Sequence, residues 1–385
     1  MPTWIHQRTL FFPLSLGVGA AFGACSSGES ATVPTAFDAA PEADTGALFD
    51  AAPVDAADTG TLPPPSPCEP LGDSPPTLEC TGLYSDFATK TVAASARPYA
   101  PAVPFWSDGA EKSRWVSLPT GSAIDTSDMN DWKFPVGTKI WKEFKLNGKR
   151  IETRFMVKLP REGWEFATYL WNKDETAAPL HRIGVRPVEG TTYEVPSVHQ
   201  CMLCHAGSKD RVLGFQAISL GLAGATGLNL ETLTTESMLT TPPISTTVEI
   251  PSGGDPTAAA ALAWLNVNCG VSCHNSGPGD AAYSGLYLKI RADEIWPAEG
   301  GAPKSIDQLD AWATSVGVAS KQQPPMASAT YERIKAGAPD ESMIVYFTGR
   351  REDTGGYVQM PPITTHTVDT AGVQLLRDWI SAMAP

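Results

Sequence analysis

The stretch WKEFKLNGKRIETRFMVK (residues 141–158) decides the fold of the first half of this chain. Apolar and polar residues alternate loosely along Trp141–Leu146 and again along Glu152–Lys158, which predicts two β-strands. Asn147-Gly148 lies between them, and this dipeptide is typical of tight hairpin turns because both residues tolerate positive φ. Trp164–Trp171 has a similar pattern and is predicted to be a third strand. The first half is therefore predicted to be mostly β.

The second half of the chain carries helix signals instead. Asp255-Pro256 joins a helix-capping residue to a proline at the first helical position, and Ala258–Val267 is the predicted helix. Asp369–Met383 is predicted to be a closing helix. The two halves meet at Thr240–Ser252, a join rich in Thr, Pro and Ser that is followed by Gly253-Gly254.

Length and composition limit the class of protein. The 385 residues accommodate two domains of ~100–200 residues each. We place a β-rich domain at residues 67–240 and a mostly α domain at 253–385, so the predicted fold class is α+β. A hydrophobic content of 42% is enough for a core, and a mean hydropathy of −0.13 excludes a polytopic membrane protein. A net charge of −14 excludes a nucleic-acid partner, which would require a basic face.

Residues 1–24 are typical of a secretory signal peptide. Leu10–Phe22 is apolar but, at 13 residues, too short to span ~30 Å of hydrocarbon. Gly23-Ala24-Cys25 resembles the bacterial lipoprotein box, which implies a lipid on Cys25 and an outer-membrane or periplasmic-face lipoprotein held to the membrane by that anchor alone. The alternative is cleavage after Ala24 that leaves Cys25 free. Residues 25–66, rich in Ala, Asp, Pro and Thr, are predicted to be a disordered acidic tether.

Four of the seven cysteines form two close pairs, each followed by a histidine. The first, Cys201-Met202-Leu203-Cys204-His205, has the C-x-x-C-H spacing of covalent haem attachment. Two thiols about one helical turn apart reach the two vinyl groups on one haem edge, and the adjacent His205 becomes the axial ligand of the iron. The alternatives are a thioredoxin-type redox pair and half of a zinc site. The sequence holds no second C-x-x-C that would complete a zinc site.

The second pair has one residue more: Cys269-Gly270-Val271-Ser272-Cys273-His274. A haem can be held here if the extra residue bulges out, and Gly270 makes such a bulge easier. The alternative is a disulfide between Cys269 and Cys273, because two residues four apart on a helix lie near the Cα separation that a disulfide tolerates.

A methionine loop near the end of the chain suits this second motif. Gln359-Met360-Pro361-Pro362 places Met360 just before the closing helix, and we predict that Met360 is the sixth ligand of the second iron. Met326, after Pro324-Pro325, is the alternative. Helix, Cys-His motif, methionine loop and final helix follow each other in the order of a class I cytochrome c.

Other candidates are less specific. Cys68 and Cys80 flank a Pro-rich loop and are predicted to form a disulfide, since export leads to an oxidising compartment. Met156 and Met238 are candidate sixth ligands of the first iron, with core packing the alternative for Met156. The group Asp108, Glu111, Lys112 and Arg114 has three interpretations: a partner-steering patch, a site for haem propionates, or a surface loop of salt bridges.

The segment PFWSDGAEK (104–112), with Arg114-Trp115, resembles a family of exported bacterial diheme c-type cytochromes. Further matching segments, spread over roughly residues 80–385, are FPVGT (134–138), ETR (152–154), VLGF (212–215) and QMPP (359–362). The resemblance implies an electron-accepting role with two covalently attached haem c groups. It implies a redox protein partner, either a dehydrogenase or another cytochrome. The usual second motif of the family is C-x-x-C-H, so Cys269–His274 departs from it.

The first domain alone is similar to the cytochrome P460 pattern. The matching residues are FPVGT (134–138), Lys142-Glu143, Trp164 and the late haem motif. This resemblance implies a β-sheet domain around one haem, in a family that oxidises hydroxylamine. Two hypotheses follow: an electron carrier with no catalytic residue, or a haem oxidoreductase (a peroxidase or a P460-like oxidase of a small nitrogen compound) that uses the first haem. A third is a structural lipoprotein whose cysteine pairs are disulfides.

Overall fold

The computed structural model describes residues 68–69, 74–161, 163–277, 281–297, 301–324, 330–351 and 359–384. They all belong to one compact unit, Pro63–Pro385. The predicted signal peptide, the lipidation site at Cys25, the tether and the alternative ligand Met326 lie outside the described residues.

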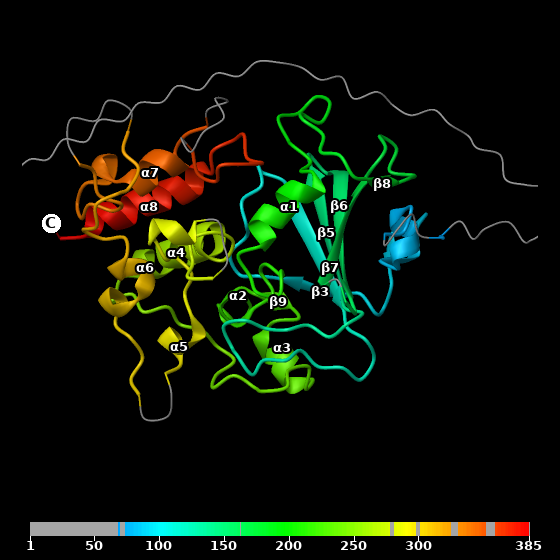
Figure 1. The fold of residues 1–385 in the computed structure, drawn as a ribbon, viewed down its shortest axis with the longest axis horizontal. Helices are drawn as coiled ribbons and strands as arrows, with labels where there is room; N and C mark the ends of the chain where they lie inside the picture. Colours follow the sequence, from blue (N-terminus) through cyan, green and yellow to red (C-terminus); the bar gives the residue numbers. More distant parts are fainter. Residues whose placement is uncertain are drawn as a thin grey trace, which may run out of the picture. The chain divides into compact units, whose positions relative to one another are not determined.

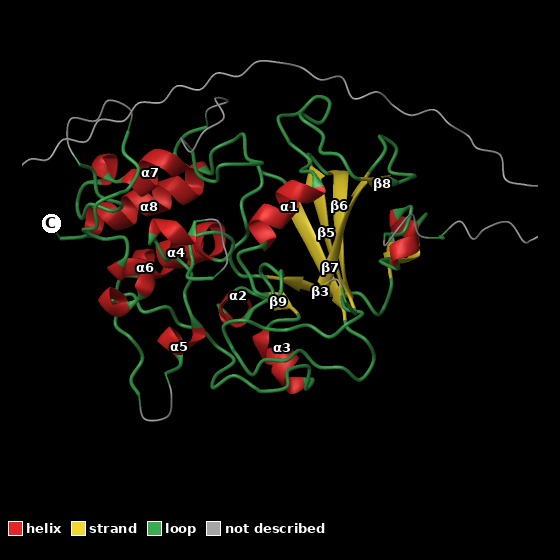
Figure 2. Ribbon diagram, viewed as in Figure 1, coloured by secondary structure: helices red, strands yellow, loops and turns green. Residues whose placement is uncertain are grey.

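Most of the strands form one antiparallel sheet of seven, in the order β8-β7-β6-β5-β4-β3-β9 (Figure 2). A separate two-stranded sheet pairs β1 with β2. The strand bounds are β1 (Tyr84–Asp86), β2 (Thr91–Val92), β3 (Arg97–Ala100), β4 (Glu111–Ser117), β5 (Lys139–Leu146), β6 (Lys149–Leu159), β7 (Gly163–Leu170), β8 (Leu180–His181) and β9 (Thr226–Gly227).

The predicted hairpin forms the centre of the sheet. Asn147 and Gly148 have φ values of 51° and 78°, as a two-residue turn of this type requires. Leu146 pairs with Lys149 directly beside the turn, and a register shift follows between Phe144 and Lys145. The first two predicted strands lie within β5 and β6, and the third, Trp164–Trp171, matches β7 except that β7 ends one residue earlier, at Leu170.

The sheet has two differently used faces, because successive side chains of a strand point to opposite sides. One face packs Trp141, Phe155 and Tyr169 against the N-terminal segment that includes Leu78 and Leu83. On the other face, apolar side chains cover only part of the sheet. They lie in neighbouring positions of β4 to β7: Val116, Ile140, Met156 and Phe166.

The helices follow mostly in the second half of the chain (Figure 1). Their bounds are α1 (Val198–His205), α2 (Ala217–Gly221), α3 (Leu230–Thr235), α4 (Pro256–Leu265), α5 (Ala292–Ile295), α6 (Asp310–Ala313), α7 (Met343–Thr348) and α8 (Thr370–Ala382). A π-helical turn, Asn266–Gly270, continues α4. Helix α8 packs on α4 and α7, whereas α1 contacts strand β7.

Both main helices are capped by an aspartate, and the cap at Asp255 is the predicted one. The Asp255 carboxylate accepts a hydrogen bond from the Thr257 amide at 2.8 Å, with Pro256 at the start of α4. The Asp369 carboxylate accepts from the Gly372 amide at 2.9 Å and begins α8. Leu262, Leu265, Leu376, Trp379 and Ile380 of these two helices form a core of their own with their neighbours.

The mixed α+β class is confirmed by the large antiparallel sheet and the helices that follow it. The predicted disulfide is also present, between Cys68 and Cys80 with a Cα–Cα distance of 5.2 Å. Within the described ranges, no helix combines the length and the apolar character needed to cross a bilayer.

Candidate functional site

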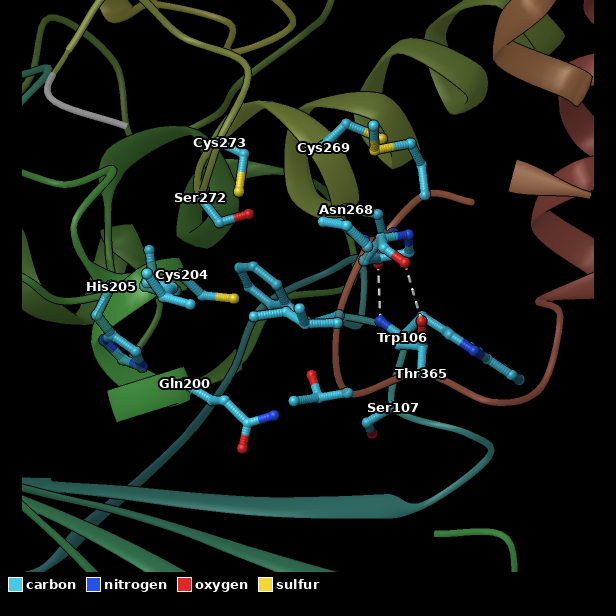
Figure 3. A pocket seen from close by; sticks show the side chains of 18 of the residues that line it. Trp106, Ser107, Gln200, Cys204, His205, Asn268, Cys269, Ser272, Cys273 and Thr365 are labelled. Carbon is cyan, nitrogen blue, oxygen red and sulfur yellow. Dashed lines mark hydrogen bonds between the residues drawn. The ribbon is translucent and has the colours of Figure 1, made fainter. Parts of the chain in front are cut away.

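A cavity of about 670 Å³ opens between the polar part of the sheet and the helices that follow. It lies within the size range of small-molecule and cofactor sites. Every residue predicted to hold a haem lines it: Cys201, Cys204, His205, Cys269, Cys273, His274 and Met360. Figure 3 shows the side chains of Cys204 and Cys273 pointing into this one pocket from two different segments.

Helix α1 presents the first motif. It begins with a capping box, in which Ser197 and Gln200 each satisfy the backbone amide of the other. The Gln200 side chain also donates to Glu194 at 2.9 Å, which fixes the start of the helix. Cys201, Cys204 and His205 then follow within the last two turns, so that both thiols and the imidazole line the cavity.

The His205 ring is held in one tautomer. Its Nδ1 lies 2.5 Å from the carbonyl oxygen of Arg211, and a carbonyl can only accept, so Nδ1 carries the proton. Nε2 is therefore the nitrogen left for a metal, as in other sites where a carbonyl orients a ligating histidine. Burial, and after it the charge of Lys142, lower the pKa of His205 to about 3. The imidazole is neutral at physiological pH, the form that binds a metal.

A wider helical turn accommodates the extra residue of the second motif. The amide of Val271 donates to the Asn266 carbonyl at 2.8 Å, and the amide of His274 donates to the Cys269 carbonyl at 2.8 Å. Both bonds span five residues instead of four, which is the pattern of a π-helix. Cys269, Cys273 and His274 all line the cavity as a result. Burial, and then Arg333, lower the pKa of His274 to about 4.

Gly270 was predicted to ease a bulge through its backbone freedom, but the structure requires a glycine here for a different reason. Its φ is not positive, so backbone freedom is not what the position requires. A Cβ at Gly270 would lie 2.4 Å from the Leu288 carbonyl carbon and from the Lys289 amide nitrogen. Gly270 is needed because a neighbouring segment of backbone approaches the motif closely.

The two motifs also touch each other. A Cβ at Gly207, two residues after the first histidine, would lie 1.9 Å from the carbonyl oxygen of Ser272 in the second motif. The Cys204 thiol has a pKa raised to about 12 by burial, then by Cys273 and Cys201. No local pattern in the sequence predicts that these segments meet.

Burial also raises the pKa of Cys201, and it raises that of Cys269 to about 12. Redox-active thiols of the thioredoxin type have a lowered pKa, since the thiolate is the nucleophile. Cys201 and Cys204, the pair in question, have a pKa shifted in the opposite direction, which disfavours the redox-pair alternative.

The segment PFWSDG ties the methionine loop in place. Asp108 accepts from the amides of His366 at 2.8 Å and Thr367 at 3.1 Å. Trp106 donates through Nε1 to the Thr367 carbonyl at 2.9 Å, and its amide donates to Asn268 beside the second motif at 2.7 Å (Figure 3). The alternative of a surface salt-bridged loop is therefore wrong for Asp108.

The other methionine and histidine residues differ in whether they line the cavity. Met156 lines the cavity, and so does Met343, which sequence analysis did not consider, whereas Met238 packs beside the apolar core of the sheet. His199 is exposed on α1. The Nε2 of His366 lies 2.7 Å from Glu194, and the His366 side chain is 25% exposed.

These residues fit a pair of covalently held haems. Each motif supplies two thiols and one histidine to the same cavity, His205 has an oriented and open Nε2, and Met360 supplies a sulfur. Among the described side chains, no group of three or more His, Cys, Asp or Glu is placed to hold a metal ion. No family model, curated protein or solved structure matches this chain.

Proposed function

We propose that this chain is an electron-transfer protein of the c-type cytochrome kind, with one haem attached at Cys201 and Cys204 and a second at Cys269 and Cys273. The observation that carries the proposal is that two motifs from separate parts of the chain line one cavity, with the Gly207 segment against Ser272. A bound haem iron supplies a one-electron couple whose potential depends on its axial ligands and its burial.

The chain's own residues have defined parts in this proposal. His205 and His274 are neutral imidazoles that face the cavity, and His205 is oriented by the Arg211 carbonyl. Met360 is placed by the hydrogen bond from its amide to the Phe347 carbonyl at 2.9 Å. We propose that the helices from α4 to α8, with the loop that holds Met360, form a class I cytochrome c-like domain at residues 253–385. The β-rich domain, with the first haem, is residues 67–240.

A haem oxidoreductase is the second candidate, and one cluster in the cavity favours it. Arg154 donates to Glu152 at 2.6 Å, and the Tyr193 hydroxyl donates to the same carboxylate at 2.6 Å. Arg154 and Tyr193 line the cavity, where their N–H and O–H groups would bind a small polar substrate.

The visible spectrum of the purified holoprotein separates these functions. Low-spin, six-coordinate bands for both haems are expected for the electron carrier. High-spin ferric bands from the first haem would favour the oxidoreductase. A protein with no Soret band would contradict both and would leave a structural lipoprotein.

We further propose that Cys25 carries the lipid and that residues 25–66 tether the folded unit to the outer membrane or the periplasmic face of a membrane. Its redox partner, a dehydrogenase or another cytochrome, would then be met in the periplasm. Cys25→Ala is expected to move the protein from the membrane fraction to the soluble periplasmic fraction on cell fractionation. Ser27→Ala, two residues further on, is the matched control and should stay with the membrane. Retention of Cys25→Ala at the membrane would contradict the anchor.

A further inference from the structure

Three cations stand side by side on the sheet face that lines the cavity. Arg114 of β4 is paired with Lys142 of β5, and Lys142 is paired with Arg154 of β6. Lys112 lies two residues before Arg114 and therefore on the same face. All four side chains line the cavity, and we call them the cation ladder.

The described residues do not neutralise this charge. Arg154 is paired with Glu152, but in the described structure no salt bridge reaches Lys112, Arg114 or Lys142. Lys112 donates to the Phe105 carbonyl, and Lys142 reaches the Leu213 carbonyl at 3.4 Å. Asp369, the carboxylate that acts on Lys112 from a distance, is occupied as the cap of α8. Lys112, Arg114 and Lys142 therefore have no carboxylate partner among the described residues.

Such an arrangement is unfavourable unless an anion accompanies it. Like charges opposite each other on a sheet destabilise it, and cations removed from bulk water require partners. The effect is visible in both lysines: burial, then Arg114 and Arg154, lower the pKa of Lys142 to about 7, and the same causes lower the pKa of Lys112 to about 7.

Arg333 also lines the cavity but, unlike the cation ladder, has several hydrogen-bond acceptors within the protein. Its guanidinium donates to three carbonyls: Ser284 at 2.6 Å, Thr314 at 2.6 Å and Gly285 at 2.8 Å. Those acceptors satisfy Arg333 within the protein. The cation ladder has no comparable set of acceptors among the described residues, so its donors are left for whatever fills the cavity.

We propose that the cation ladder of Lys112, Arg114, Lys142 and Arg154 binds the carboxylate groups of the ligand that fills this cavity. This inference rests on the proposed function, in which the ligand is a haem with two propionates. Lys142 and Arg154 also act electrostatically on Cys201 and Cys204, so the ladder shares the cavity wall with the first motif. Arginine pairs bidentately with a carboxylate and lysine pairs as a point charge, which suits a row of mixed cations.

The test compares two lysines of one strand. Lys142→Met removes a ladder cation, and Lys139→Met is the matched control. Lys139 also lies on β5 and also donates to a carbonyl, that of Thr81 at 3.0 Å, but it is not among the cavity-lining residues. The midpoint potentials of both haems are measured by spectroelectrochemical titration, and the haem number of each variant is checked by intact mass.

Loss of a nearby cation disfavours the reduced, less positive state of the haem. Lys142→Met is therefore expected to lower one of two midpoint potentials by about 59 mV, equal to a tenfold change in the one-electron equilibrium constant. Lys139→Met should leave both midpoint potentials unchanged. Lys142→Arg keeps the positive charge and should therefore have the wild-type potentials. Lys112→Met, at the end of the ladder, provides a second variant with the same expected direction should Lys142→Met fail to fold.

Three results would overturn the ladder. Unchanged potentials in both Lys142→Met and Lys112→Met, with two haems attached, would reject it and leave the proposed function intact. An equal fall in Lys139→Met would show a general effect of surface charge and would also reject it. A wild-type chain without haem would reject the proposed function itself, and the ladder with it.

Discussion

Met360→Ala is expected to lower one of the two midpoint potentials by on the order of 0.2 V, a fraction of the ~0.8 V range that axial ligands span. A thioether is a soft ligand that favours the ferrous state, so its loss favours the ferric state. The loop is well placed for this role: Met360 lines the cavity, and Asp108 holds the segment just after it. The other potential should not move, because His205 lies on a different segment.

Two other methionines provide the comparison. Met343→Leu changes a second sulfur that lines the cavity, and Met326→Ala removes the alternative ligand predicted from the sequence. Both variants should keep both potentials and the weak ferric absorption near the red end of the spectrum, which Met360→Ala should lose. Loss of that absorption in Met326→Ala or Met343→Leu instead would show that Met360 is not the ligand.

Gly270→Ala is expected to reduce the free energy of unfolding by about 2–3 kcal/mol, the usual range for an atom forced into a packed site. Alanine has a higher helix propensity than glycine. The φ of Gly270 is not in the left-handed region, so the local backbone would accept an alanine. The cost comes from the Cβ that would lie 2.4 Å from the Leu288 backbone. Leu288 cannot move away easily, because its amide donates to the His274 carbonyl at 2.7 Å.

Thermal denaturation measures this effect, with Gly121→Ala as the control. Gly121 has a φ of 75° and a Cβ there would meet no atom within 4 Å, so its substitution measures backbone strain alone, ~1 kcal/mol. Intact mass should also show that Gly270→Ala loses the second haem from part of the population. A Gly270→Ala protein as stable as the Gly121→Ala protein would contradict the close approach of Leu288.

Short sequence patterns were sufficient to predict the central hairpin of the sheet and the start of helix α4. The Asn147-Gly148 turn and the Asp255 cap depend on neighbouring residues, and both are present in the structure. The predicted closing helix is also present, as Thr370–Ala382. The residues of the site were also found from spacing, because two thiols and a histidine close in sequence must lie close in space.

The cation ladder could not be predicted, although two of its residues, Lys142 and Arg154, lay in predicted strands. A two-residue turn with Leu146 opposite Lys149 would place Lys142 opposite Thr153 if the pairing continued without a break. The register shift between Phe144 and Lys145 moves Lys142 opposite Arg154 instead. A slip of one residue changes which side chains share a face, and the sequence contains no signal for this bulge.

Long-range contacts were equally hidden. Asp108 and Thr367 are 259 residues apart, and their hydrogen bond depends on how the whole chain folds. The same holds for Gly207 against Ser272, which brings the two Cys-His motifs together. The π-helical turn at Asn266–Gly270 replaces the expected bulge, since five-residue hydrogen bonds absorb the extra residue within the helix.

The number of covalent haems per chain tests the central claim most directly. Intact mass of the purified protein, combined with a haemochrome assay, should give two haems for the wild type. Cys201→Ala with Cys204→Ala should leave one, and Cys269→Ala with Cys273→Ala should leave the other. A wild type with one haem that disappears in Cys201→Ala with Cys204→Ala would show that Cys269–His274 binds no haem, and a wild type with none would contradict the whole account.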